Sequence, residues 1–122
     1  MDLTDLKIGG FVAMVEFALD AVAMKGRLGY RSGIRPNHWM PGRDYTFMGH
    51  LHFVDREWLK PGEKCEAKGS FIIAEQDFIS FVPGFTWQVG EGHKIVGQCR
   101  LLRVEGALES LPTSDDIARR SG

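Results

Sequence analysis

Alternation of apolar and polar residues with a period of two most restricts how this chain can fold. From Cys65 to Ile73, every second residue is small or apolar, and polar residues fill most of the positions between them. This pattern predicts a strand with one buried face. Phe85, Trp87 and Val89 repeat it, so we expect Trp87 to point into the core.

Turn sequences separate the expected strands. Residues 90–93 read Gly-Glu-Gly-His and lie between residues 85–89 and a second extended run at 95–104, which predicts a hairpin. Residues 48–53 form another short strand. The Lys-Pro-Gly-Glu sequence at 60–63 predicts a turn, because proline presets one backbone dihedral angle and glycine frees the next.

The segment 11–25 fits two periods. Periodicity and the richness in Ala and Met favour a helix. As a strand, the segment would bury one face from Phe11 to Leu19 and expose a second apolar face. The apolar residues at helical spacing are Phe11, Met14, Val15, Ala18, Leu19 and Val22, and the exposed strand face would carry Val12, Met14 and Ala18.

Length and charge narrow the class of protein. The 122 residues form one domain, which should bury roughly two thirds of the surface of the unfolded chain. With 15 Lys and Arg against 16 Asp and Glu, the net charge of -1 argues against a broad, sequence-blind nucleic-acid binder, so any RNA contact must be local. The longest apolar run, 11–15, is far short of the ~20 residues of a membrane-spanning helix.

Compartment and redox state follow from the termini and the cysteines. The acidic N-terminus is unlike the start of a secretory signal, so we expect a cytoplasmic protein with no membrane partner. Cys65 and Cys99 lie in segments patterned as strands and are expected to be reduced, buried thiols. The chain has no Gly-x-Ser-x-Gly elbow, which argues against nucleophilic catalysis, and no phosphate-binding glycine loop, which argues against nucleotide binding. We therefore expect a protein that is not an enzyme and binds no cofactor.

A pair of histidines offers one metal-dependent alternative. His50 and His52 on a strand would point to one face, and Glu57 follows at the spacing of half a cupin metal motif. The second half of that motif is not matched. The other interpretation is that both histidines face solvent while Leu51 and Phe53 face the core.

Three polar segments indicate phosphate and sugar contacts. Residues 25–27 with Arg31, residues 35–39 and residues 91–94 combine cations with glycine and with amide or aromatic groups. Ordinary loop polarity is the alternative explanation.

Residues 31–39, Arg-Ser-Gly-Ile-Arg-Pro-Asn-His-Trp, resemble a loop in the third domain of elongation factor Tu and its relatives, where Arg-Pro-Gln precedes aromatic residues. Further segments match that domain in order, over about residues 11–104. They are the opening strand at 11–19, the glycine-led strand at 49–53, the turn at 60–63, the strand at 71–73 and the hairpin at 85–97.

The resemblance implies an all-β fold, a six-stranded antiparallel β-barrel over residues 11–104, in which 11–19 is a strand. Residues 1–10 would then be a lead-in and residues 105–122 a polar tail. The resemblance does not include the GTPase domain of the family. The function that it implies for this domain is contact with the T-stem backbone of aminoacyl-tRNA.

Residues carried over from the family place an RNA site on the loops. The family's amide falls on Asn37, its Glu-Gly pair on Glu91 and Gly92, and an arginine near Arg27, whereas Ile73 replaces a polar contact residue. Arg35 and Lys94 lie in the same loops.

We therefore expect a non-catalytic module that binds tRNA-like RNA or a translation protein. The alternatives are a protein–protein inhibitor of the immunity type and, third, the metal-dependent enzyme. The inhibitor would use Val12, Met14 and Ala18.

Overall fold

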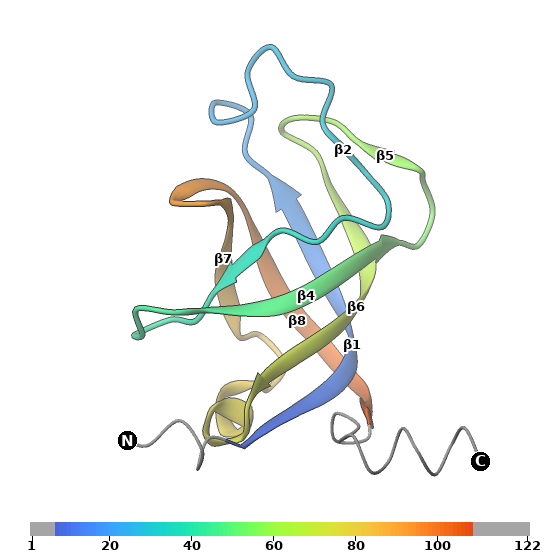
Figure 1. Cartoon of the computed structure of the whole chain (residues 1–122). Helices are drawn as coiled ribbons and strands as arrows, with labels where there is room; N and C mark the ends of the chain where they lie inside the picture. Colours follow the sequence, from blue (N-terminus) through green and yellow to red (C-terminus); the bar gives the residue numbers. More distant parts are fainter. Residues whose placement is uncertain (1–6, 109–122) are drawn as a thin grey trace, which may run out of the picture.

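The computed structural model describes residues 7–108, which form a closed barrel of six antiparallel strands in the order β1-β6-β4-β3-β7-β8 (Figure 1). The predicted fold class is confirmed. The barrel strands are β1 (Ile8–Leu19), β3 (Asn37–Trp39), β4 (Thr46–Phe53), β6 (Lys64–Ala74), β7 (Thr86–Glu91) and β8 (Lys94–Leu108).

Two smaller elements complete the described chain. β2 (Tyr30–Arg31) and β5 (Trp58–Leu59) pair in a separate two-stranded sheet beyond one end of the barrel, and the 3-10 helix η2 (Glu75–Ser80) lies at the other end (Figure 1). Within residues 7–108, no helix has the length and apolar character that crossing a membrane requires. Residues 1–6 of the predicted lead-in and residues 109–122 of the predicted tail lie outside the described part.

Pairing on both edges makes β1 a strand. β1 pairs with β6 on one side and β8 on the other, so that Phe17 lies opposite both Cys65 and Cys99. This confirms the strand over the helix that periodicity alone favoured. β1 begins at Ile8, three residues earlier than predicted, and β8 continues to Leu108, four residues beyond 104.

The outer face of β1 corrects one expectation. Met14 exposes only 7% of its surface, and Val12 and Ala18 are half-buried. Met14 lies between Lys68 of β6 and Arg103 of β8 in the register. Long side chains of this kind cover apolar neighbours with their methylene stems. The predicted exposed apolar face is therefore wrong at its central residue.

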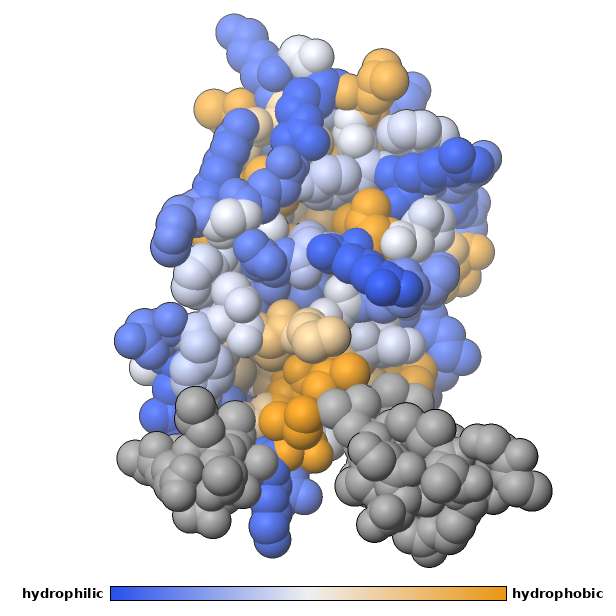
Figure 2. All heavy atoms as spheres, viewed as in Figure 1, coloured by the Kyte–Doolittle hydropathy of each residue, from blue (hydrophilic) through white to orange (hydrophobic). Residues whose placement is uncertain are grey.

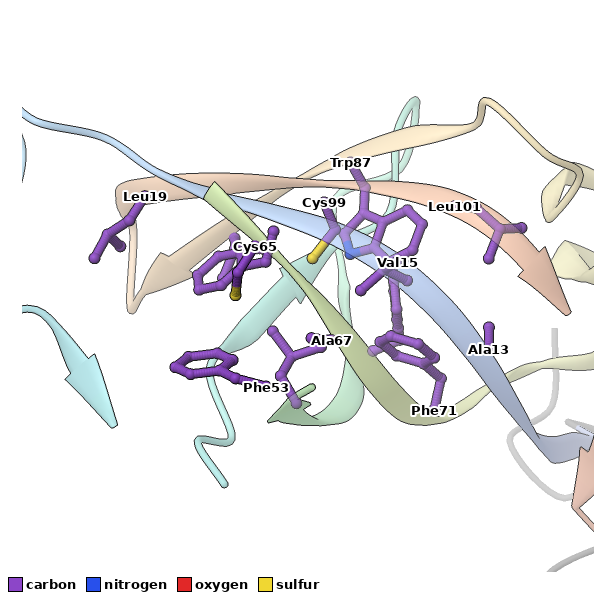
Figure 3. Close-up of a cluster of buried hydrophobic side chains, with 14 of the residues drawn as sticks. Ala13, Val15, Leu19, Phe53, Cys65, Ala67, Phe71, Trp87, Cys99 and Leu101 are labelled. Carbon is purple, nitrogen blue, oxygen red and sulfur yellow. The ribbon is translucent and has the colours of Figure 1, made fainter. Parts of the chain in front are cut away.

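The interior is an aromatic core. Trp87 is 2% exposed, as predicted, and its ring centroid lies 5.6 Å from that of Phe71 and 5.5 Å from that of Phe81. Figure 3 shows Trp87 and Phe71 among side chains that converge from β1, β6, β7 and β8. Cys65 and Cys99 are buried free thiols, as expected from the sequence.

A buried histidine completes this core. His38 is fully buried, and Trp87 Nε1 donates a hydrogen bond to its Nδ1 at 2.9 Å. Burial lowers the pKa of His38 to about 4, which keeps the imidazole neutral and able to accept that bond. The sequence placed His38 in a polar loop segment. The structure corrects this, because the alternation in β3 turns His38 inward between Asn37 and Trp39.

Candidate nucleic-acid interface

Pairing of β3 with β7 builds the centre of the candidate site. It sets the backbone of Asn37 opposite Gly90. The Asn37 side-chain nitrogen donates to the Gly92 carbonyl oxygen at 3.4 Å, a long hydrogen bond. Gly92 has a φ of 58°, a left-handed backbone conformation that favours glycine at this turn. A half-buried amide and an exposed glycine backbone therefore lie side by side.

Arg27, Tyr30 and Glu91 form a second part of the site, which we call the Glu91 clasp. Arg27 Nη1 lies 2.5 Å from Glu91 Oε1, and the Tyr30 hydroxyl donates to the same oxygen. The Arg27 guanidinium also lies 5.5 Å from the centroid of the Tyr30 ring. These contacts tie the segment after β1 to the tip of the β7–β8 hairpin.

The clasp fixes the ionisation of its members. Hydrogen bonds from Tyr30 and then Arg27 hold the pKa of Glu91 below its usual value, so the carboxylate stays charged. Burial and the bond to Glu91 raise the pKa of Tyr30, so its hydroxyl keeps the donated proton. The sequence did not identify Tyr30, because its partner lies 61 residues away.

Arg35 and Lys94 differ from the other cations of the site. Among residues 7–108, Arg35 is the one arginine with no carboxylate within ion-pairing distance, and Lys94 has none either. Arg35 Nε instead lies 3.3 Å from His50 Nε2. Lys94 lies opposite Glu91 in the hairpin and helps to lower its pKa. Neither cation forms an ion pair in the described chain, although Lys94 is near enough to Glu91 to act on it electrostatically.

A groove of about 350 Å³ lies beside Arg35 on the barrel wall. Asn37, Met48 and Ile72 are direct neighbours across β3, β4 and β6, and line it together with Arg35 and His50. Met48 exposes 68% of its surface. An apolar strip therefore adjoins the polar site, which sequence reasoning did not foresee.

The structure does not assemble the metal alternative. His50 and His52 have ring centroids 4.6 Å apart on the outer face of β4, with Leu51 and Phe53 facing inward. Glu57 is engaged elsewhere, because Arg31 Nε donates to it at 2.8 Å. In the described range 7–108, no three His, Cys, Asp or Glu side chains gather as a metal site.

The predicted residues fall on two parts of the barrel. Arg27, Asn37, Glu91, Gly92 and Lys94 gather around the hairpin tip, and Arg35 lies on the adjoining wall. β1, with Val12, Met14 and Ala18, is three strands from β3 in either direction round the ring. No protein-family model matches the chain, and no curated protein matches its sequence significantly.

Proposed function

We propose that this chain is a non-catalytic binding module, a relative of the third domain of elongation factor Tu, whose hairpin site binds the sugar-phosphate backbone of tRNA-like RNA. The supporting observation is that Arg35 and Lys94 lack carboxylate partners in the described chain and border the Asn37 amide and the Gly92 backbone. Free cations, amides and open backbone are the groups that bind phosphate and sugar.

Each residue has a distinct part in this proposal. Arg35 and Lys94 supply the charge, and Asn37 donates to a phosphate or sugar oxygen. Gly92 allows close approach because it carries no side chain. Glu91 is held by Arg27 and Tyr30, so it positions the hairpin rather than contacting the RNA. With so few cations, binding should be weak.

Filter binding of tRNA over a range of salt concentrations tests the proposal. The logarithm of the affinity should fall with the logarithm of salt concentration with a slope of about -2 to -4. Arg35→Ala and Lys94→Ala should each reduce the steepness by about one. Lys7→Ala, which removes a charge next to β1, serves as the matched control and should change neither value. Absence of tRNA binding at low salt would contradict the proposal.

A protein partner is the second candidate, either a translation protein or the target of an immunity-type inhibitor. The observation that favours it is exposed Met48 in the groove, rather than the predicted residues of β1. Co-purification from the native cell, with RNA and protein both identified, separates the two candidates. Recovery of a stoichiometric protein without RNA would put the protein partner first.

A further inference from the structure

Two aromatic side chains stack outside the barrel, next to the proposed backbone site. Trp39 of β3 and His93 of the β7–β8 turn have ring centroids 5.6 Å apart and planes inclined by 29°. Trp39 Nε1 lies over Gly90, where a Cβ atom would come within 3.3 Å of it. The same Cβ atom would lie 2.7 Å from the Lys94 carbonyl oxygen, so glycine at position 90 is required mainly by the hairpin backbone and also leaves room for the indole.

A cavity of about 580 Å³ adjoins this pair. Trp39, Gln88 and Gln98 are direct neighbours across β3, β7 and β8, and all three line the cavity with His93. A β-bulge between Val89 and Gly90 interrupts the hairpin there, and bulges increase strand twist and re-aim side chains. The volume is within the range of about 300 to 1,000 Å³ typical of small-molecule sites.

The lining suits a flat, uncharged, polar ring. Trp39 and His93 offer aromatic surface for stacking, and each glutamine amide offers both a donor and an acceptor. Arg43 also lines the cavity, but its Nε lies 3.7 Å from Asp77, whose carboxylate offsets its charge. A heterocyclic base with donors and acceptors on its edge matches these groups.

We propose that this cavity binds one unpaired nucleobase of the RNA. Asn37 lies two residues before Trp39, and Gly92 immediately precedes His93, so neighbouring residues would hold the base and its own backbone. The inference rests on the proposed RNA function and narrows it. The partner must present an unstacked base at a loop or single strand, because a base inside a continuous duplex has no free face.

The test compares a short single-stranded RNA with a blunt duplex of the same sequence, using fluorescence anisotropy. Wild type should prefer the single strand. Trp39→Leu should weaken single-strand binding about tenfold and leave the salt slope unchanged, because stacking carries no charge. Trp39→Phe should restore most of the affinity. Trp58→Leu, at a tryptophan that is 44% exposed on β5, is the matched control and should have no effect.

Two further measurements keep the inference and the backbone proposal separable. His93→Ala tests the stack if Trp39→Leu folds poorly. In a Trp58→Phe background, which keeps Trp39 and Trp87, adenosine should quench the tryptophan fluorescence, and adding Trp39→Phe should remove most of that quenching. If Trp39→Leu and His93→Ala both keep the wild-type affinity and salt slope for the single strand, and adenosine causes no quenching, the base site is wrong. The backbone proposal would still stand. Adenosine quenching without salt-dependent RNA binding supports the base site and overturns the backbone proposal.

Discussion

His38 is a titratable side chain held inside an aromatic core. Its pKa is about 4 in the folded protein and about 6.5 in an unfolded chain. The folded state therefore resists protonation of His38. The contribution of His38 to the unfolding free energy is fully present above about pH 6.5 and is lost as the pH falls toward 4. Below both pKa values, the total loss is about 3 kcal/mol.

His38→Gln should remove this part of the pH dependence. Its side-chain oxygen can still accept from Trp87 Nε1, but the amide does not titrate. Between pH 7.5 and 4.5, wild type should lose about 2 to 3 kcal/mol more unfolding free energy than the variant. Urea unfolding at the two pH values measures this difference. Equal losses would show that His38 is not responsible.

At the scale of the strand, two glycines make room for the core rings. A Cβ atom at Gly49 of β4 would lie 2.5 Å from His38 Nε2 and 2.6 Å from Phe71 Cδ1. A Cβ atom at Gly69 of β6 would lie 2.3 Å from the Phe71 ring. β4 and β6 are thus strands whose inward glycines are required by packing rather than by backbone conformation.

Gly49→Ala should destabilise the protein by about 1 to 3 kcal/mol, because the added methyl group overpacks the site around His38. Gly106→Ala is the matched control, since Gly106 lies in β8 with no atom within 4 Å of the new Cβ position. It should change the unfolding free energy by less than about 0.5 kcal/mol. Urea denaturation compares the two, and similar effects at both positions would contradict the packing argument.

For the whole molecule, closure depends on β1, which joins β6 to β8. Cys65 and Cys99 lie on those two strands (Figure 3). In the register, both are paired with Phe17 of β1. Burial raises the pKa of Cys65 to about 11 and also raises that of Cys99, so neither is a reactive thiolate near neutral pH.

Figure 2 shows mostly hydrophilic residues on the face of the molecule that Figure 1 also views, with a group of apolar residues toward its lower end.

Both thiols should become reactive only when the barrel opens as a unit. In a disulfide reagent at pH 8, Cys65 and Cys99 should be labelled at the same slow rate, and across urea concentrations this labelling should follow the loss of the far-ultraviolet circular dichroism signal. Mass spectrometry of each cysteine peptide gives the two rates. Fast labelling of one cysteine with an unchanged spectrum would reveal local opening and contradict the prediction.

The sequence by itself determined the strands whose two faces differ. Alternation is a local property, so it was enough to predict the strand at 65–73, the inward Trp87, and Leu51 and Phe53 facing the core. The turn at 60–63 was also predictable, because Gly62 takes a positive φ of 85° after a proline. The candidate loops were recognisable by composition, and the closed six-strand arrangement followed only from the family resemblance.

Only the tertiary structure decided features that depend on distant residues. The apolar residues of β1 fit both the helical spacing and the two-residue spacing of a strand, and pairing with β6 and β8 made the segment a strand. Met14 is buried between its two neighbouring strands, and His38 is turned inward against Trp87, 49 residues away. Glu91 became part of a clasp because the closed barrel brought Arg27 to it across 64 residues of sequence. Local patterns carry no information about such contacts, since burial and charge pairing depend on which strands become neighbours.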